Sequence, residues 1–141
     1  MFRLRKVNVF FAVIIGWLGG SILNGMLVNV GHWVFPLEGI DTNDMEALAE
    51  IMPTLEYEFY IFPFLAHALG TLAGSALAAF FAIKNQLRAA MIVGVIFLGG
   101  GIAVNLMIPS QTWFVLVDIF IAYIPMAWLG YMIVQKFENA L

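Results

Sequence analysis

The stretch that decides the fold is residues 59–83, which read FYIFPFLAHALGTLAGSALAAFFAI. It contains no charged side chain and exceeds the roughly 20 residues that a helix needs to cross the hydrocarbon core of a bilayer. Three further apolar stretches predict helices at about residues 7–30, 89–108 and 112–134. The chain is therefore predicted to be an all-α integral membrane bundle of four transmembrane helices, formed by one domain of residues 1–141.

The composition of the whole chain supports a membrane protein. Of the 141 residues, 63% are hydrophobic and only 11% are charged, whereas about a quarter of a soluble domain is charged. A soluble domain of this size has too little interior to bury so much apolar surface, so the lipid bilayer is the expected partner. No nucleic-acid partner is expected. The absence of cysteine excludes disulfides and thiolate metal sites.

The charged residues are separated along the chain. The basic residues fall before the first predicted helix, between the second and third, or after the fourth, and they are Arg3, Arg5, Lys6, Lys84, Arg88 and Lys136. The loop of about residues 31–58 carries only acidic charges, at Glu38, Asp41, Asp44, Glu46, Glu50, Glu56 and Glu58. Because basic residues are retained on the cytoplasmic side, both termini are predicted to be cytoplasmic and this loop to lie outside.

The outer loop contains the signals of a short helix. Asp41 to Asp44 supply capping side chains, Glu46 falls in the first turn, and Pro53 stops the helix after Met52. We expect this interfacial helix to lie on the membrane surface or to cap the bundle.

Each predicted spanning helix carries one strong hydrogen-bonding residue on a stripe of small residues. These residues are Asn24, His67, Asn105 and Asp118. Small residues let helices approach closely in lipid, so the stripes are expected to face the bundle interior. Counting from the outer helix ends puts all four polar residues roughly 5–12 Å below the outer boundary. The pattern predicts a polar pocket that opens to the periplasmic side.

Asp118 and His67 are the strongest candidates for a functional site. An Asp in a spanning helix costs about 2.5–3.5 kcal/mol near the helix centre, so it must be buried, paired or used. His67 is its expected partner, either in a proton or ligand site or in a polar clasp between the second and fourth helices. Asn24 and Asn105 could belong to the same ligand site or could join helices.

Other polar residues could line the mouth of this pocket, namely His32, Glu56 and Glu58. Their alternative is an ordinary solvated loop, because loop charges are usually exposed. A divalent metal such as Zn could be bound by His67, Asp118, His32 and Glu58 together. No closely spaced ligand pair supports that metal site, so it is the weaker interpretation.

Two runs of sequence carry a resemblance. Residues 62–72 read FPFLAHALGTL and residues 122–130 read AYIPMAWLG, with Trp113, Phe114 and Asp118 between them. These runs resemble small uncharacterised four-span membrane proteins of bacteria, and the resemblance covers nearly the whole chain. It implies a multi-pass protein of the bacterial inner (plasma) membrane and carries no activity.

Three functions remain open from the sequence. The first is binding or passage of a cation, a proton or a small polar ligand at Asp118 and His67. The second is a membrane-embedded enzyme for a lipid-like substrate, with His67 as general base, but no nucleophile is evident and enzyme activity stays undecided. The third is a non-catalytic accessory subunit of a membrane complex. A chain of four helices is expected to act as a homo-oligomer or with a membrane-protein partner.

Overall fold

The computed structural model describes residues 6–140, and helices account for its architecture. The long helices are α1 (Val9–Val34), α3 (Ile61–Phe81), α4 (Gln86–Met107), and α5 (Thr112–Ile121) followed by α6 (Ile124–Asn139). Together with the turn before α3, they provide 4 helical segments that are long and apolar enough to cross a membrane. The predicted all-α bundle of four spans is confirmed, and the chain has the architecture of a multi-pass membrane protein.

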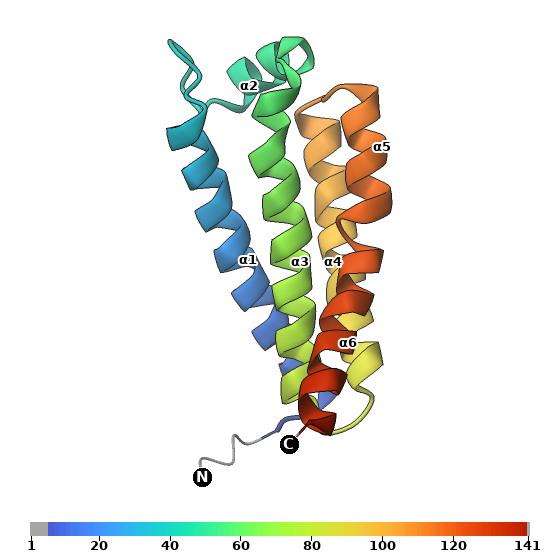
Figure 1. Cartoon of the computed structure of the whole chain (residues 1–141). Helices are drawn as coiled ribbons and strands as arrows, with labels where there is room; N and C mark the ends of the chain where they lie inside the picture. Colours follow the sequence, from blue (N-terminus) through green and yellow to red (C-terminus); the bar gives the residue numbers. More distant parts are fainter. Residues whose placement is uncertain (1–5, 141) are drawn as a thin grey trace.

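The two ends of the bundle differ. Figure 1 shows the start of α1 and the end of α6 at one end, here called the termini end, and the short helix α2 (Met45–Ile51) at the other, here called the loop end. Lys6 precedes α1, and Lys84 lies in the turn between α3 and α4, so both belong to the termini end. Arg3 and Arg5 lie outside the described residues.

α3 is the central helix of the bundle, because it contacts α1, α4 and α6, and its most extensive contact is with α1. A Cβ placed on Gly16 would lie 2.3 Å from the carbonyl oxygen of Gly74, and one on Gly20 would lie 2.5 Å from the carbonyl oxygen of Gly70. The two backbones therefore touch where the small-residue stripes meet, as helices in lipid do. The expectation that these stripes face the bundle interior is confirmed.

The fourth span is interrupted. Pro125 occupies the first turn of α6, and the chain leaves the helical path at Ala122 and Tyr123. Proline has no amide hydrogen, so the carbonyl oxygen of Ile121 cannot receive the usual helical hydrogen bond. The sequence prediction of one helix at 112–134 is corrected to two helices, α5 and α6.

The first loop is ordered and partly anchored. α2 begins after Asp44, whose side chain accepts hydrogen bonds from the amides of Glu46 and Ala47. Two short 3₁₀ turns follow, Met52–Thr54 and Tyr57–Tyr60. The side-chain amide of Gln111 donates to the carbonyl oxygen of Leu55 at 2.6 Å, which ties the loop to the start of α5. The predicted short helix and its Asp cap are confirmed.

Candidate functional site

A buried cluster of three polar side chains joins α3 to the fourth span. The Nδ1 atom of His67 lies 2.9 Å from Oδ1 and 3.0 Å from Oδ2 of Asp118. The hydroxyl of Tyr123 donates to Oδ2 of Asp118 at 2.8 Å and lies 2.9 Å from the same Nδ1 atom. Asp118 is 0% exposed, so its carboxyl group depends on these two partners. The predicted contact between His67 and Asp118 is present.

The break between α5 and α6 explains how Tyr123 joins the cluster. In an unbroken α-helix, two residues five positions apart point about 140° away from each other around the axis. Asp118 and Tyr123 are separated by five positions, yet both reach His67 because the helix is interrupted at Tyr123. The break at Pro125 therefore has a local consequence, which is to add a hydroxyl to the pair that the sequence predicts.

Gly101 of α4 provides the space for that hydroxyl. A Cβ on Gly101 would lie 2.0 Å from the Tyr123 hydroxyl oxygen and 2.4 Å from the ring carbon that bears it. A Cβ on the preceding Gly100 would meet nothing within 4 Å. The two adjacent glycines thus face different environments. Gly101 faces the polar cluster, and Gly100 faces the outside of the bundle.

Substituting these glycines tests the placement of Tyr123. Gly101→Ala is expected to displace the Tyr123 hydroxyl from Asp118 and to lower the free energy of unfolding by about 1–3 kcal/mol, as overpacking does. Gly100→Ala is the matched control and is expected to be neutral or slightly stabilising, because alanine favours helix. Unfolding measured in lipid bicelles compares the two variants, and equal stability would contradict this placement.

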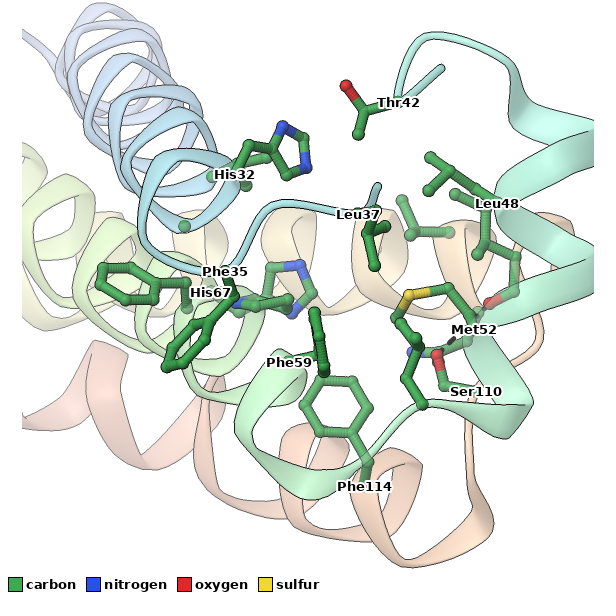
Figure 2. Close-up of a pocket in the computed structure, with 18 residues that line it drawn as sticks. His32, Phe35, Leu37, Thr42, Leu48, Met52, Phe59, His67, Ser110 and Phe114 are labelled. Carbon is green, nitrogen blue, oxygen red and sulfur yellow. Dashed lines mark hydrogen bonds between the residues drawn. The ribbon is translucent and has the colours of Figure 1, made fainter. Parts of the chain in front are cut away.

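A cavity of about 220 Å³ lies at the loop end, between α1, α3, α4 and the first loop. Most of its wall is apolar or aromatic, formed by Val28, Gly31, Phe35, Leu37, Leu48, Met52, Leu55, Phe59, Phe62, Pro63, Val104, Ile108 and Phe114. Its polar lining residues are His32, Thr42, His67, Asn105 and Ser110. Figure 2 shows the His67 ring near the centre, with Phe59 and Phe114 on one side and His32 and Thr42 on the other.

His67 connects the polar cluster to this cavity. Asp118 and Tyr123 hold its Nδ1 atom and do not line the cavity, whereas His67 does. In the part of the chain that the structure describes, every hydrogen bond of the imidazole is made through Nδ1. The Nε2 edge is therefore left for whatever occupies the cavity. Its side chain is 16% exposed, so the group is accessible but largely shielded.

Of the other residues predicted for the site, some line the cavity and some do not. Asn105 and His32 line the cavity, and the Asn105 side chain also donates to the carbonyl oxygen of Gly101 at 3.0 Å. Asn24 instead packs against Gly70 of α3 and does not line the cavity. Glu56 and Glu58 also lie outside the lining, and Glu56 is exposed.

The residues proposed as metal ligands do not form one group. Among residues 6–140, no three His, Asp or Glu side chains lie together as a candidate metal site. His67 and Asp118 are paired, but Glu58 is absent from the cavity that His67 and His32 share.

The sequence analysis expected the short helix to lie on the membrane surface or to cap the bundle, but it named neither Tyr123 nor any apolar loop residue of the cavity wall as a site residue. A tyrosine two positions before a proline, and five after a buried Asp, was the signal available for Tyr123. For the loop residues of the cavity wall, the signal was the apolar face of the short helix. Leu48 on this face and the adjoining Met52 line the cavity.

In comparisons with family models, curated proteins and solved structures, the chain matches none of them.

Proposed function

We propose that this chain is a membrane protein that binds a small amphipathic molecule in the loop-end cavity, with the molecule's polar group hydrogen-bonded to His67. The observation that carries the proposal is the unpartnered Nε2 edge of His67 in a cavity whose wall is otherwise mostly aromatic and aliphatic. Ligand sites typically combine such a wall with a few well-placed polar groups. An amphipathic ligand is a more specific expectation than the cation, proton or small polar ligand that the sequence left open.

The lining argues against a bare cation as the ligand. Of the described residues, those that line the cavity include no Asp, Glu, Lys or Arg. A cation there would exchange its water shell for phenylalanine rings and a few neutral groups. Desolvation of an ion without a counter-charge costs several kcal/mol, which an uncharged amphipathic molecule avoids.

Binding is better supported than passage. Between the polar cluster and the termini end, the bundle is filled by small or apolar side chains that are 0% exposed, namely Ala12, Ala78, Ala82, Ala89 and Val93 together with the hydroxyl-bearing Thr71 and Ser75. The contact of Gly16 with Gly74 lies in the same region. A solute that reached His67 would meet close packing beyond it, so the cavity is a site and not a pore.

The proposal includes an orientation. We place the chain in a bacterial inner membrane with both termini cytoplasmic and the cavity open to the periplasmic side. The resemblance to small bacterial four-span proteins supports the location. The orientation is supported by Lys6, Lys84 and Lys136 at the termini end and by the acidic first loop at the opposite end.

Histidine NMR tests the binding proposal directly, because the chain contains only 2 histidines. The probe is 1-octanol, whose hydroxyl can either donate or accept a hydrogen bond. In protein labelled with ¹⁵N-histidine and held in lipid nanodiscs, 1-octanol is expected to shift the Nε2 resonance of His67 saturably.

Two variants on α1 give this test its control. Val28→Trp fills the cavity from a lining position that is only partly exposed, and it is expected to abolish the shift. Val30→Trp adds the same side chain to a position of the same helix that is 46% exposed and outside the lining, and the shift is expected to persist. An unchanged His67 signal in the wild-type protein, or an equal shift in the Val28→Trp protein, would refute binding at this site.

A further inference from the structure

The charge of the buried cluster determines what His67 presents to the cavity. Asp118 is 0% exposed, and its only hydrogen-bond partners among the described residues are His67 and the hydroxyl of Tyr123. Among residues 6–140, no Lys or Arg lies in the cavity wall to balance a net charge. An uncompensated charge inside a membrane bundle is expensive, so the cluster is expected to be neutral as a whole.

Because the Tyr123 hydroxyl donates to Asp118, two proton arrangements make the cluster neutral. In one, the Asp118 carboxylate is ionised and the His67 imidazolium carries protons on both ring nitrogens. In the other, the Asp118 carboxyl is protonated and donates to Nδ1 of His67, which puts the imidazole proton on Nε2. Tyr123 donates to Asp118 in both. The two neutral arrangements therefore agree on one point, which is that Nε2 carries a hydrogen toward the cavity.

From this we infer that the ligand is an uncharged amphipathic molecule whose polar group offers a carbonyl-type oxygen to the Nε2–H of His67. The inference rests on the proposed function and names the ligand class for the same site. A buried N–H donor requires an acceptor, and an apolar group placed against it would leave it unsatisfied. An anionic acceptor would bring an unbalanced charge into a wall to which the described residues contribute no Lys or Arg.

The surroundings of His67 fit such a molecule. Phe35 and Phe59 belong to one aromatic group, with ring centroids 5.9 Å apart, and Phe35 and Phe62 lie 6.1 Å apart. All three rings line the cavity, as does Phe114, which lies on the same side of His67 as Phe59 (Figure 2). An alkyl or aromatic body packs against these rings while its oxygen reaches Nε2.

A pair of shape-matched probes tests the inference. 2-Nonanone carries a carbonyl oxygen, and 2-methyl-1-nonene has the same shape with a CH₂ group in its place. Each is used to displace 1-octanol from ¹⁵N-histidine-labelled protein in nanodiscs. The ketone is expected to bind about tenfold more tightly than the alkene, the gain of one hydrogen bond to a buried donor. The matching anion, octanoate, is expected to bind more weakly than the ketone.

The same ¹⁵N spectra, recorded without any ligand, report whether Nε2 of His67 is protonated. A protonated Nε2 of His67 in the free protein is the expected result. A bare Nε2, or equal binding of ketone and alkene, would overturn the inference. The proposed function would still stand if 1-octanol shifted the His67 signal. If 1-octanol fails to shift His67, the proposed function itself fails, so the two failures are distinguishable.

The carbonyl could belong to a bilayer lipid or to a free molecule, and two nanodiscs distinguish these sources. Ester-linked phosphatidylcholine offers carbonyl groups, and its ether-linked counterpart does not. A hydrogen-bonded His67 Nε2 in the ester lipid alone identifies the bilayer as the source. Identical free-protein spectra in both lipids, with a response only to added 2-nonanone, identify a free molecule. A response to neither source contradicts the inference.

Discussion

Replacing Asp118 by alanine is expected to lower the free energy of unfolding by about 2 kcal/mol or more and to abolish 1-octanol binding at His67. The substitution removes the partner that Nδ1 of His67 and the hydroxyl of Tyr123 share. A buried donor that loses its partner costs about 1–3 kcal/mol, although polar contacts inside membrane bundles average about 0.6 kcal/mol. The lost hydrogen bonds and the new cavity together place the sum at about 2 kcal/mol.

Asp118→Asn is the control for this prediction. The amide has the shape of the carboxyl group and can satisfy both His67 and Tyr123, so most of the stability is expected to remain. Unfolding in lipid bicelles and the ¹⁵N spectrum of His67 are measured on the same samples. The prediction fails if the alanine variant is as stable as the asparagine variant, since the carboxyl group would then hold nothing together.

Gly16→Ala is expected to separate α1 from α3 and to destabilise the bundle by about 1–3 kcal/mol. Its Cβ would lie 2.3 Å from the carbonyl oxygen of Gly74 and 2.8 Å from the Cβ of Ala78. Neither atom is the end of a flexible side chain, so the helices themselves must move. The effect has to exceed the gain of about 1 kcal/mol that alanine brings to a helix interior.

Gly25 of the same helix provides the matched control. A Cβ there would meet nothing within 4 Å, so Gly25→Ala is expected to be neutral or stabilising. The difference between the two variants isolates the packing of α1 on α3 from helix propensity. Free energies of unfolding measured in bicelles decide the question, and two alanine variants of equal stability would show that this contact does not hold α1 in place.

The sequence predicted the spans well because lipid imposes one strong requirement, a long apolar helix. The positions of helix ends were less certain. α1 continues to Val34, which brings His32 onto the helix, and α4 begins at Gln86. Such helix ends are set by single polar groups or by a turn in the loop, and a hydrophobicity pattern does not show where these occur.

The candidate site was half predictable. His67 and Asp118 could be paired from the sequence, because two costly polar groups inside a bundle need partners. Tyr123 depends on the direction of the chain after a helix break, which periodicity cannot give. Likewise, no spacing rule predicts whether the Glu58 side chain lines the cavity. In the structure it does not.

The most direct test of the account is a structure of the protein extracted together with its native lipids. The account predicts density for a bound molecule within hydrogen-bond distance of Nε2 of His67, in contact with Phe59 and Phe114. A loop-end cavity that holds only water, or one that has closed over His67, would contradict the claim that this side chain is the polar centre of a ligand site.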